Sequence, residues 1–234
     1  MATGSPERTQ PITCPTCHSQ SVASNGKKNE HNNKPIDIIE QTGMNELKKY
    51  LETLIHFTES EMDVFTSLFS EIQLKKNDYF AKEGEFSSKL AFVSNGVLRA
   101  FFRNKTGNEY NKTFFTRSNF VAPYSSITTK QKNLINIQCL TDCTLLVADF
   151  RQLTSLYKDY PKIESLARIM AEYKFSIKEK REIELVTLEA TERYEIFKKE
   201  HPNLENLINQ YHIASYLGIT PTQLSRIRSQ NSKA

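Results

Sequence analysis

The stretch that decides the fold reads Ile213-Ala214-Ser215-Tyr216-Leu217-Gly218-Ile219-Thr220-Pro221-Thr222-Gln223-Leu224-Ser225-Arg226-Ile227-Arg228 and lies near the C-terminus. Its apolar residues have helical spacing on each side of Gly218 and lose that spacing across it. Gly218 supplies the free backbone that a sharp turn needs, Thr220 is a typical N-cap, and Pro221 suits the first position of a helix. The stretch therefore predicts two short helices joined by a tight turn.

The second of these helices would present polar and basic side chains to solvent. The candidate DNA-contacting set is Thr220, Pro221, Thr222, Gln223, Ser225, Arg226 and Arg228. None of these residues carries a carboxylate, and arginine and glutamine are the side chains that read guanine and adenine in the major groove. Arg226 is the strongest candidate for a base contact, followed by Thr222 and Gln223. The pattern by itself leaves an ordinary helical hairpin open as the alternative.

Composition sets wide bounds on the class of protein. The chain has 234 residues and a net charge of +4, which is too small to indicate nucleic-acid binding without other evidence. No run of about 18 apolar residues occurs, so no membrane-spanning segment is expected. The N-terminus lacks an apolar signal core, and four cysteines do not make a disulfide scaffold, so we expect a cytoplasmic protein.

Residues 1–43 are polar and are expected to form a mobile leader. Cys14 and Cys17 form a Cys-x-x-Cys pair, which is half of a tetrahedral zinc site, but only His31 follows at a suitable distance. The pair resembles the opening of the zinc ribbon of some insertion-sequence transposases. A vestigial or fused leader, an incomplete metal site and an irrelevant tail remain open, and no metal is assigned. Met44 would be a natural start for the next domain.

Two helices and a run of strands are expected after the leader. Helical spacing predicts one helix from Asn45 to Phe57 and a second that begins near Ser60. From Ile72 to Phe150 the period changes to two, with turn signals between short apolar runs, which indicates an antiparallel sandwich or barrel. The expected strands are 90–93, 97–102, 110–115, 134–140 and 144–147.

Two details of this β region are specific enough to test. Asn95-Gly96 is a strong hairpin signal because both residues tolerate positive φ. In the last two strands, Cys139 would face the same way as its apolar neighbours and meet Leu145 and Val147. Cys139 is therefore interpreted as a small buried hydrophobic side chain and not as a ligand.

A short helical segment at 153–158 is followed by a long helix, expected from about Lys162 to Glu189. Its heptad seam consists of Ile163, Leu166, Met170, Tyr173 and Ile177. The length of the helix and the narrow apolar stripe favour pairing with the same helix of a second chain. The alternative is a helix that packs only on its own barrel.

The order of these elements, from Asn45 to Arg228, carries a family resemblance. The most specific segments are 213–221 and 224–228, supported by Glu192-Arg193-Tyr194 and by Ser94-Asn95-Gly96-Val97-Leu98-Arg99. In these features the chain resembles the Crp/Fnr family of bacterial transcription regulators, in the branch common among Bacteroidetes-type bacteria. The resemblance implies an α+β fold: an N-terminal antiparallel β-roll of the cyclic-nucleotide-binding type (a double-stranded β-helix), a long central dimerisation helix and a C-terminal helix-turn-helix domain.

The expected domains are a leader at 1–43, a sensor-like β-roll at 44–152, a short helix and the dimerisation helix at 153–190, and the helix-turn-helix domain at 191–234. The resemblance also implies the partners. They are a second copy of the chain and a near-palindromic double-stranded DNA operator, with one recognition helix in each major groove. RNA polymerase is a further partner that the resemblance allows.

Residues 116–126 stand where family members that bind cyclic AMP carry their phosphate cassette. Those members have a Gly-Glu pair and an arginine that clamps the phosphate, whereas here Ser118-Asn119 replace the pair and no arginine follows Ser126 before Lys130. A buried phosphate would lack its charge partner, so cyclic AMP is not expected as a ligand. The candidates for lining a pocket for another small-molecule effector are Tyr124, Ser125, Ser126 and Tyr173. The alternative for them is a surface loop.

The leading hypothesis is a dimeric, sequence-specific transcription regulator that does not respond to cyclic AMP. The alternative is a ligand-binding β-roll whose helical C-terminus mediates protein contacts. No enzyme is expected, because no nucleophile–base order, phosphate-binding loop or carboxylate pair stands out. No cofactor is expected either, since Cys14 and Cys17 alone cannot supply the four positions of the family's iron–sulfur cluster.

Overall fold

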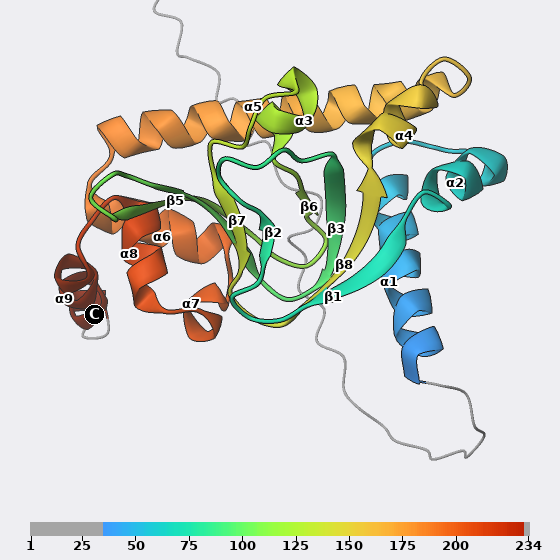
Figure 1. Cartoon of the computed structure of the whole chain (residues 1–234). Helices are drawn as coiled ribbons and strands as arrows, with labels where there is room; N and C mark the ends of the chain where they lie inside the picture. Colours follow the sequence, from blue (N-terminus) through green and yellow to red (C-terminus); the bar gives the residue numbers. More distant parts are fainter. Residues whose placement is uncertain (1–34, 232–234) are drawn as a thin grey trace, which may run out of the picture.

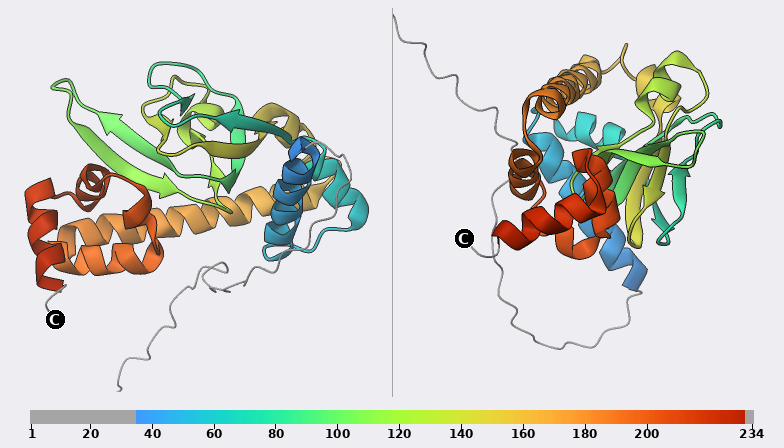
Figure 2. Two further views of the ribbon diagram at one scale, coloured as in Figure 1. Left: turned by 90° about the horizontal axis from the view of Figure 1, so that it is seen from below. Right: turned by 90° about the vertical axis from the view of Figure 1, so that its left-hand side faces the viewer.

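The computed structural model describes residues 35–231. Two four-stranded antiparallel sheets form a β-roll in the middle of the molecule, and one long helix, α5 (Pro161–Thr187), runs along its side. At one end of α5 lie the helices that precede the roll, and at the other end lie the C-terminal helices α6 to α9 (Figure 1, Figure 2). The fold is therefore α+β, as the sequence predicts.

The chain enters through α1 (Pro35–Glu52) and α2 (Glu59–Thr66). α1 begins earlier than the sequence indicates, so the boundary placed at residue 43 falls inside a helix. Gly43 is a weak helix former, and it hides the continuity of α1 in the sequence pattern. α2 starts at a capping box, in which the backbone N–H of Glu61 donates to Oγ1 of Thr58 at 3.3 Å and the Thr58 N–H donates to the Glu61 carboxylate at 2.7 Å.

The eight strands are β1 (Ser70–Leu74), β2 (Tyr79–Ala81), β3 (Lys89–Asn95), β4 (Leu98–Arg103), β5 (Glu109–Phe115), β6 (Phe120–Val121), β7 (Asn136–Cys139) and β8 (Cys143–Asp149). One sheet has the order β1-β8-β3-β6 and the other has the order β2-β7-β4-β5. All five expected strands are present. A short helix, α3 (Tyr124–Thr129), follows β6 where the sequence predicted a loop or cavity wall.

The hairpin predicted at Asn95-Gly96 is wrong. β3 and β4 flank this turn but belong to different sheets, so the turn carries the chain from one sheet to the other. Gly96 is needed there for another reason: its φ is +97°, and an added Cβ would lie 2.5 Å from the carbonyl oxygen of Asp142. The neighbouring turn approaches so closely because Val97 N–H donates to Oγ1 of Thr141 at 2.9 Å.

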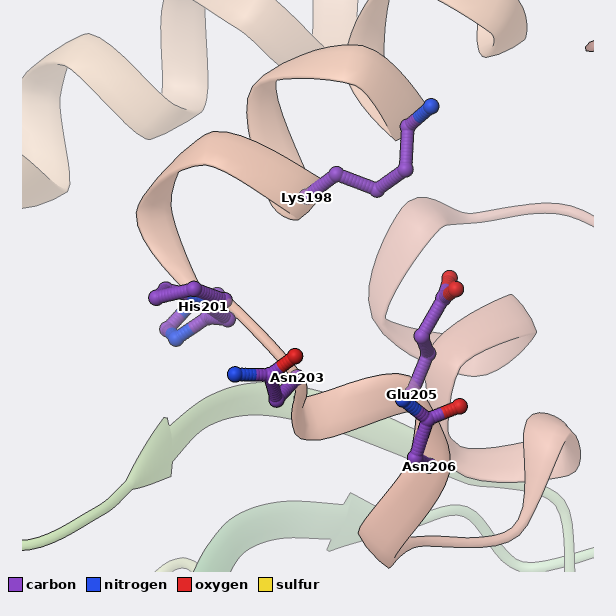
Figure 3. Close-up of a pocket in the computed structure, with 6 residues that line it drawn as sticks. Lys198, His201, Asn203, Glu205 and Asn206 are labelled. Carbon is purple, nitrogen blue, oxygen red and sulfur yellow. The ribbon is translucent and has the colours of Figure 1, made fainter. Parts of the chain in front are cut away.

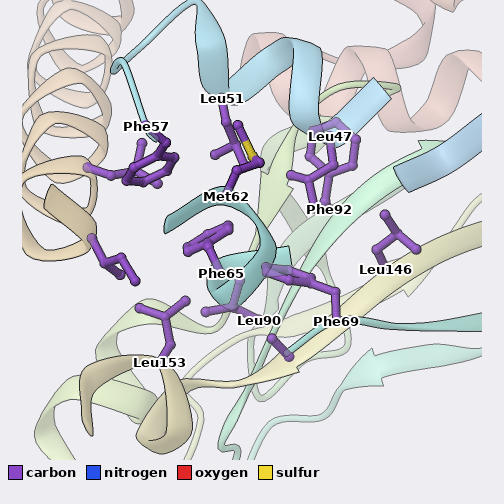
Figure 4. Close-up of a cluster of buried hydrophobic side chains, with 13 residues drawn as sticks. Leu47, Leu51, Phe57, Met62, Phe65, Phe69, Leu90, Phe92, Leu146 and Leu153 are labelled. Atoms are coloured by element: carbon purple, nitrogen blue, oxygen red, sulfur yellow. The ribbon is translucent and has the colours of Figure 1, made fainter. Parts of the chain in front are cut away.

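The space between the sheets is filled by apolar side chains. Leu98, Ile137, Cys139 and Leu145 are all fully buried there, so the interpretation of Cys139 as a core residue is confirmed. A second core joins α1, α2, β3, β8 and the helices that follow the roll (Figure 4). Within the part of the chain that the structure describes, no helix has both the length and the apolar composition that a membrane crossing requires.

α4 (Phe150–Ser155) and α5 follow the roll in the order that the sequence predicts. α4 begins three residues before the predicted segment 153–158, whereas α5 agrees closely with the predicted helix. The residues of the predicted heptad seam, however, differ in burial from one end of the seam to the other. Ile163 and Leu166 are 0% and 2% exposed and pack in the core with α1 and α2. They cannot reach a second chain, so their assignment to a dimer seam is wrong. Met170 and Tyr173 are half-buried, and Ile177 is 43% exposed.

Candidate nucleic-acid interface

The C-terminal domain consists of α6 (Ala190–Glu200), α7 (Leu204–Leu207), α8 (Gln210–Leu217) and α9 (Pro221–Asn231). α8 and α9 are the two helices predicted from the sequence, with the turn at Gly218. Gly218 adopts φ +68° and ends α8, and its N–H bonds back to the carbonyls of Ala214 and Ser215. This left-handed residue is the usual helix stop, and it redirects the chain into α9.

Thr220 caps α9, but it does so together with Gln223. The Gln223 N–H donates to Oγ1 of Thr220 at 3.2 Å, and the Thr220 N–H donates to Oε1 of Gln223 at 3.0 Å. This reciprocal pair is a capping box. The amide oxygen of Gln223 is therefore engaged at the helix start, and the bidentate reading of adenine expected of this side chain would first have to break the cap.

Apolar residues on one side of α9 hold it against the rest of the domain. Leu224 is fully buried and Ile227 nearly so, in a cluster with Ile213, Leu217 and Phe197. The exposed side of α9 follows directly from this anchoring. Pro221, Thr222, Gln223, Ser225 and Arg226 are all exposed, as the sequence predicts for a reading face.

Arg228 differs from the other members of the predicted set. Its side chain is half-buried, its Nη1 atom is fully buried, and its charge acts on the phenol of Tyr194. The Tyr194 hydroxyl donates to the carboxylate of Glu205 at 2.6 Å, and burial raises the pKa of Tyr194 to about 12. Arg228 therefore leans toward the domain interior, whereas Arg226 points out.

Two arginines that the sequence reasoning did not assign hold the C-terminal end of α8. The guanidinium of Arg181, from α5, donates to the carbonyl oxygen of Tyr216 and stacks over its ring at 4.0 Å. Nε of Arg193 donates to the carbonyl oxygen of Leu217 at 3.1 Å, and the same side chain also bonds the carbonyl of Leu188. Cations at a helix C-terminus satisfy its last carbonyls. These contacts fix α8 to α5 and α6.

The domain is also docked on its own β-roll, through α8 and β5. Oγ of Ser215 donates to the carbonyl oxygen of Glu109 at 2.7 Å and accepts from the Asn111 N–H at 3.0 Å. Nδ2 of Asn111 donates to the carbonyl oxygen of His212 at 3.0 Å. The side of α8 that carries His212 and Ser215 thus faces protein and not DNA.

Arg99 of β4 lies behind this contact and is buried. Its guanidinium pairs with Glu109 at 2.6 Å, bonds Gln138 at 2.7 Å and stacks over the ring of Phe101 at 3.7 Å. Burial opposes ionisation of Glu109, but hydrogen bonds from Arg103 and Arg99 outweigh it and hold the pKa of this carboxyl below its ordinary value. A buried arginine with this many partners fixes the local geometry of β4, β5 and β7.

His212 completes the network. Nη1 of Arg99 lies 3.1 Å from Nδ1 of His212, which accepts this hydrogen bond when the ring is neutral. Burial and then the Arg99 charge lower the pKa of His212 to about 4. The ring is therefore neutral at pH 7, and the docking contact is suited to that state.

The four candidate effector residues do not converge on one cavity. Tyr124 and Ser125 are exposed on α3, and Tyr173 lies on α5. Ser126 is buried, with its hydroxyl donating to the carbonyl of Gln131 at 2.5 Å, and it lines a pocket whose other walls come from α4 and the β2–β3 loop.

A smaller pocket of about 260 Å³ lies at the turn between α6 and α7 (Figure 3). Lys198 and Glu205 in its wall already pair with Glu195 and Tyr194. Within residues 35–231, no group of three or more His, Cys, Asp or Glu side chains is arranged to hold a metal ion. Cys14, Cys17 and His31 lie outside the described residues.

We compared the chain with known protein families and with solved structures. Residues 71–160, from β1 to the start of α5, match the family described as cyclic nucleotide-binding domain. The match concerns the β-roll and the short helix that follows it. No match to a curated protein is found.

Several solved structures are also similar in fold to this chain. FixK2 from Bradyrhizobium japonicum has a TM-score of 0.62 at 17% identity, over 70% of this chain and 85% of that one. CLP, a c-di-GMP responsive global regulator of Xanthomonas campestris, has a TM-score of 0.60 at 13% identity, over 75% and 92%. CooA from Carboxydothermus hydrogenoformans, solved as a mutant, has a TM-score of 0.57 at 18% identity, over 79% and 84%. At these identities the likeness establishes the fold, which is that of the Crp/Fnr regulators.

Proposed function

We propose that the chain is a dimeric, sequence-specific DNA-binding transcription regulator that acts in the cytoplasm. The outward face of α9 carries the proposal, because Thr222, Ser225 and Arg226 are exposed while Leu224 and Ile227 anchor the helix. A recognition helix that enters the major groove needs this division into an anchored side and a hydrogen-bonding side. The likeness in fold to Crp/Fnr regulators supports the same function.

Within this proposal the side chains have different roles. Arg226 contacts a base edge, preferably guanine, and Thr222 contacts a neighbouring base or its phosphate. Thr220 and Pro221 position the start of α9, where backbone N–H groups favour a phosphate. Gln223 contributes its amide NH₂, because its oxygen belongs to the cap.

Dimerisation remains part of the proposal, but through a different face of α5. Phe175 and Val186 are 67% and 87% exposed, and Ile183 is 57% exposed. Residues 175 and 186 are eleven positions apart, or three helical turns, so they share one face, on the opposite side of α5 from Leu166. Large apolar groups exposed in a row on one face mark an interface. We place the seam there, with the side of Met170, Tyr173 and Ile177 as the alternative.

The absence of a cyclic AMP response is also proposed. Arg117, the one arginine in residues 116–126, pairs with Glu46 of α1 at 2.7 Å and is directed away from the roll interior. The interior itself is filled by apolar side chains such as Leu98 and Ile137. A cyclic phosphate would find no cationic partner among them, which makes its burial unfavourable.

Selection of bound sequences from random duplexes, followed by gel shift, tests the DNA proposal. We expect a near-palindromic site, and we expect Arg226→Ala to weaken binding to it by about 1–3 kcal/mol. Lys158→Ala removes a charge on an exposed side chain remote from α9 and should leave the affinity unchanged. An enriched pool without a common sequence, or an equal effect of the two variants, would contradict the proposal.

Sedimentation equilibrium tests the dimer and its seam separately. Phe175→Glu places a charge on the proposed face and should shift the protein to monomers, whereas Ile177→Glu on the alternative side should leave the dimer intact. The reverse outcome would move the seam to the heptad side, and a monomeric wild-type protein would exclude both.

A further inference from the structure

A second pocket, of about 470 Å³, lies between the loop that joins β2 to β3, helix α3 and helix α4. Its size falls within the range of small-molecule sites in proteins. It is separate from the space between the two sheets, which apolar side chains fill. Its wall includes Phe86 from the loop, Ser126 and Lys130 from the α3 segment, and Phe150 and Arg151 from α4.

The charge of this pocket is one-sided. Lys130 and Arg151 line it, both are exposed, and the wall contains no carboxylate. Neither side chain forms an ion pair within the part of the chain that the structure describes. The nearby carboxylate of Asp149 caps α4 by accepting from the backbone N–H groups of Arg151 and Gln152. The Ser88 side chain, the largest cause, and also the charge of Arg151 lower the pKa of this carboxyl below its ordinary value. Two cations, Lys130 at the C-cap of α3 and Arg151 on α4, therefore line one space that favours an anion.

The remaining wall combines two aromatic rings with serine and threonine side chains, of which Ser126 and Thr128 donate their hydroxyls within the protein. Phe86 is 69% exposed at the pocket, and Phe150 is half-buried, with its ring 6.5 Å from that of Tyr124. The hydroxyl of Ser126 donates to the Gln131 carbonyl, and that of Thr128 donates to the carbonyl of Tyr124. The two cations supply the charged part of the recognition, and the two rings favour a flat apolar body.

We propose that this pocket binds a small aromatic carboxylate, with its carboxylate held by Lys130 and Arg151 and its ring placed against Phe86 and Phe150. Such a ligand would tie α3 to α4. α4 carries Leu153, which packs in the same core as Ile163 at the start of α5. The consequence for DNA binding rests on the proposed function, whereas binding itself does not.

Equilibrium dialysis of the full chain with radiolabelled phenylacetate tests the site without DNA. We expect saturable binding of one ligand per chain, competed by unlabelled phenylacetate. The neutral isostere phenylacetamide and the ringless anion acetate should each compete at least about tenfold more weakly, since each loses one of the two recognition elements.

Variants then locate the binding. Arg151→Gln and Lys130→Gln should each raise the dissociation constant at least about tenfold, because each removes one charged hydrogen-bond donor. Lys158→Gln removes an exposed charge outside the pocket and is the matched control. Phe86→Ser should weaken phenylacetate but leave acetate unchanged.

Three results would overturn the assignment: no saturable binding at about 10 mM phenylacetate, equal competition by phenylacetamide, or equal effects of Arg151→Gln and Lys158→Gln. A gel shift on the same variants without ligand keeps the two proposals apart. Loss of phenylacetate binding with unchanged DNA affinity concerns the pocket alone.

Discussion

Replacing His212 by glutamine should remove part of the acid sensitivity of the folded chain. The ring of His212 accepts a hydrogen bond from Arg99 at 3.1 Å, and burial, followed by the Arg99 charge, lowers its pKa to about 4. Other cations near the ring are Arg103, which shares Glu109 with Arg99, and Lys76. Glu109 raises the pKa of His212, whereas the charges of Arg99 and Lys76 lower it further, in the same direction as burial.

Proton linkage gives the direction in which His212 makes stability depend on pH. Below about pH 6.5 the unfolded chain protonates this histidine, whereas the folded chain holds it neutral down to about pH 4. Its stabilising contribution is therefore present above pH 6.5 and is lost as the pH falls toward 4. The full shift in the pKa of His212 would lower the free energy of unfolding by about 2.4 kcal/mol between pH 7 and pH 4.5. Because the ring is only partly buried, solvent screens its charge, and we expect a loss of unfolding free energy of about 1 kcal/mol.

Urea unfolding of the wild type and of His212→Gln at pH 7 and at pH 4.5 measures this contribution. Glutamine retains an acceptor for Arg99 but does not titrate. The drop in unfolding free energy between the two pH values should be about 1 kcal/mol smaller in the variant. His201, half-buried beside Phe197, titrates in both proteins and cancels in the comparison. His56→Gln, at an exposed position, is the control, and a drop in His212→Gln equal to that of the wild type would refute the reasoning.

Three further predictions concern stability. Leu224→Ala opens a cavity under α9 and should cost about 2–5 kcal/mol of unfolding free energy, while the exposed Ser225→Ala should change it by less than about 0.5 kcal/mol; equal costs would mean that α9 is not anchored as described. Thr220→Ala removes the cap and should cost about 1 kcal/mol in the same assay, and no loss would discount the capping box. Gly96→Ala should cost more than Gly107→Ala, since both have positive φ but only Gly96 has a carbonyl oxygen 2.5 Å from the added Cβ; equal melting temperatures would contradict the close approach.

The sequence predicted best where the signal is local. The turn at Gly218 and the cap at Thr220 depend on single residues whose backbone or hydrogen-bonding properties are specific. The anchoring of α9 through Leu224 and Ile227 follows from helical period alone. These features also define most of the candidate reading face, which is why the exposure of Thr222, Ser225 and Arg226 could be predicted.

The structure differs from the sequence-based predictions mainly where segments that are distant in the sequence pack together. Ile163 and Leu166 fit a heptad seam equally well whether they face a second chain or α1 and α2, and period cannot tell these partners apart. Asn95-Gly96 carries the residues of a hairpin turn, yet the glycine is required by the close approach of Asp142.

α3 was missed for a different reason. It reads Tyr-Ser-Ser-Ile-Thr-Thr, a segment poor in helix formers, and its hydroxyls compete for backbone groups. In the folded chain those hydroxyls bond the carbonyls of the helix itself, as Thr128 and Thr129 do to Tyr124 and Ser125. Context thus converts a weak local preference into a short helix.

Arg99 was not recognised as a buried contact between domains. In the strand pattern a single arginine normally indicates a solvent-facing position, and nothing in the sequence links it to His212, 113 residues away. The same reasoning applies to Arg181 and Arg193, whose partners are backbone carbonyls and leave no trace in the sequence.

The salt dependence of affinity for the selected duplex, measured for the wild type and for Arg226→Ala, tests the central claim most directly. Binding through phosphate contacts should weaken steeply with added salt. Between 50 and 200 mM salt, the affinity should fall roughly tenfold for every few phosphate contacts. The variant should keep most of that slope while losing about 1–3 kcal/mol on the selected duplex and little on a scrambled one. An affinity that is indifferent to salt and to duplex sequence would contradict the account and favour a helical C-terminus that binds protein.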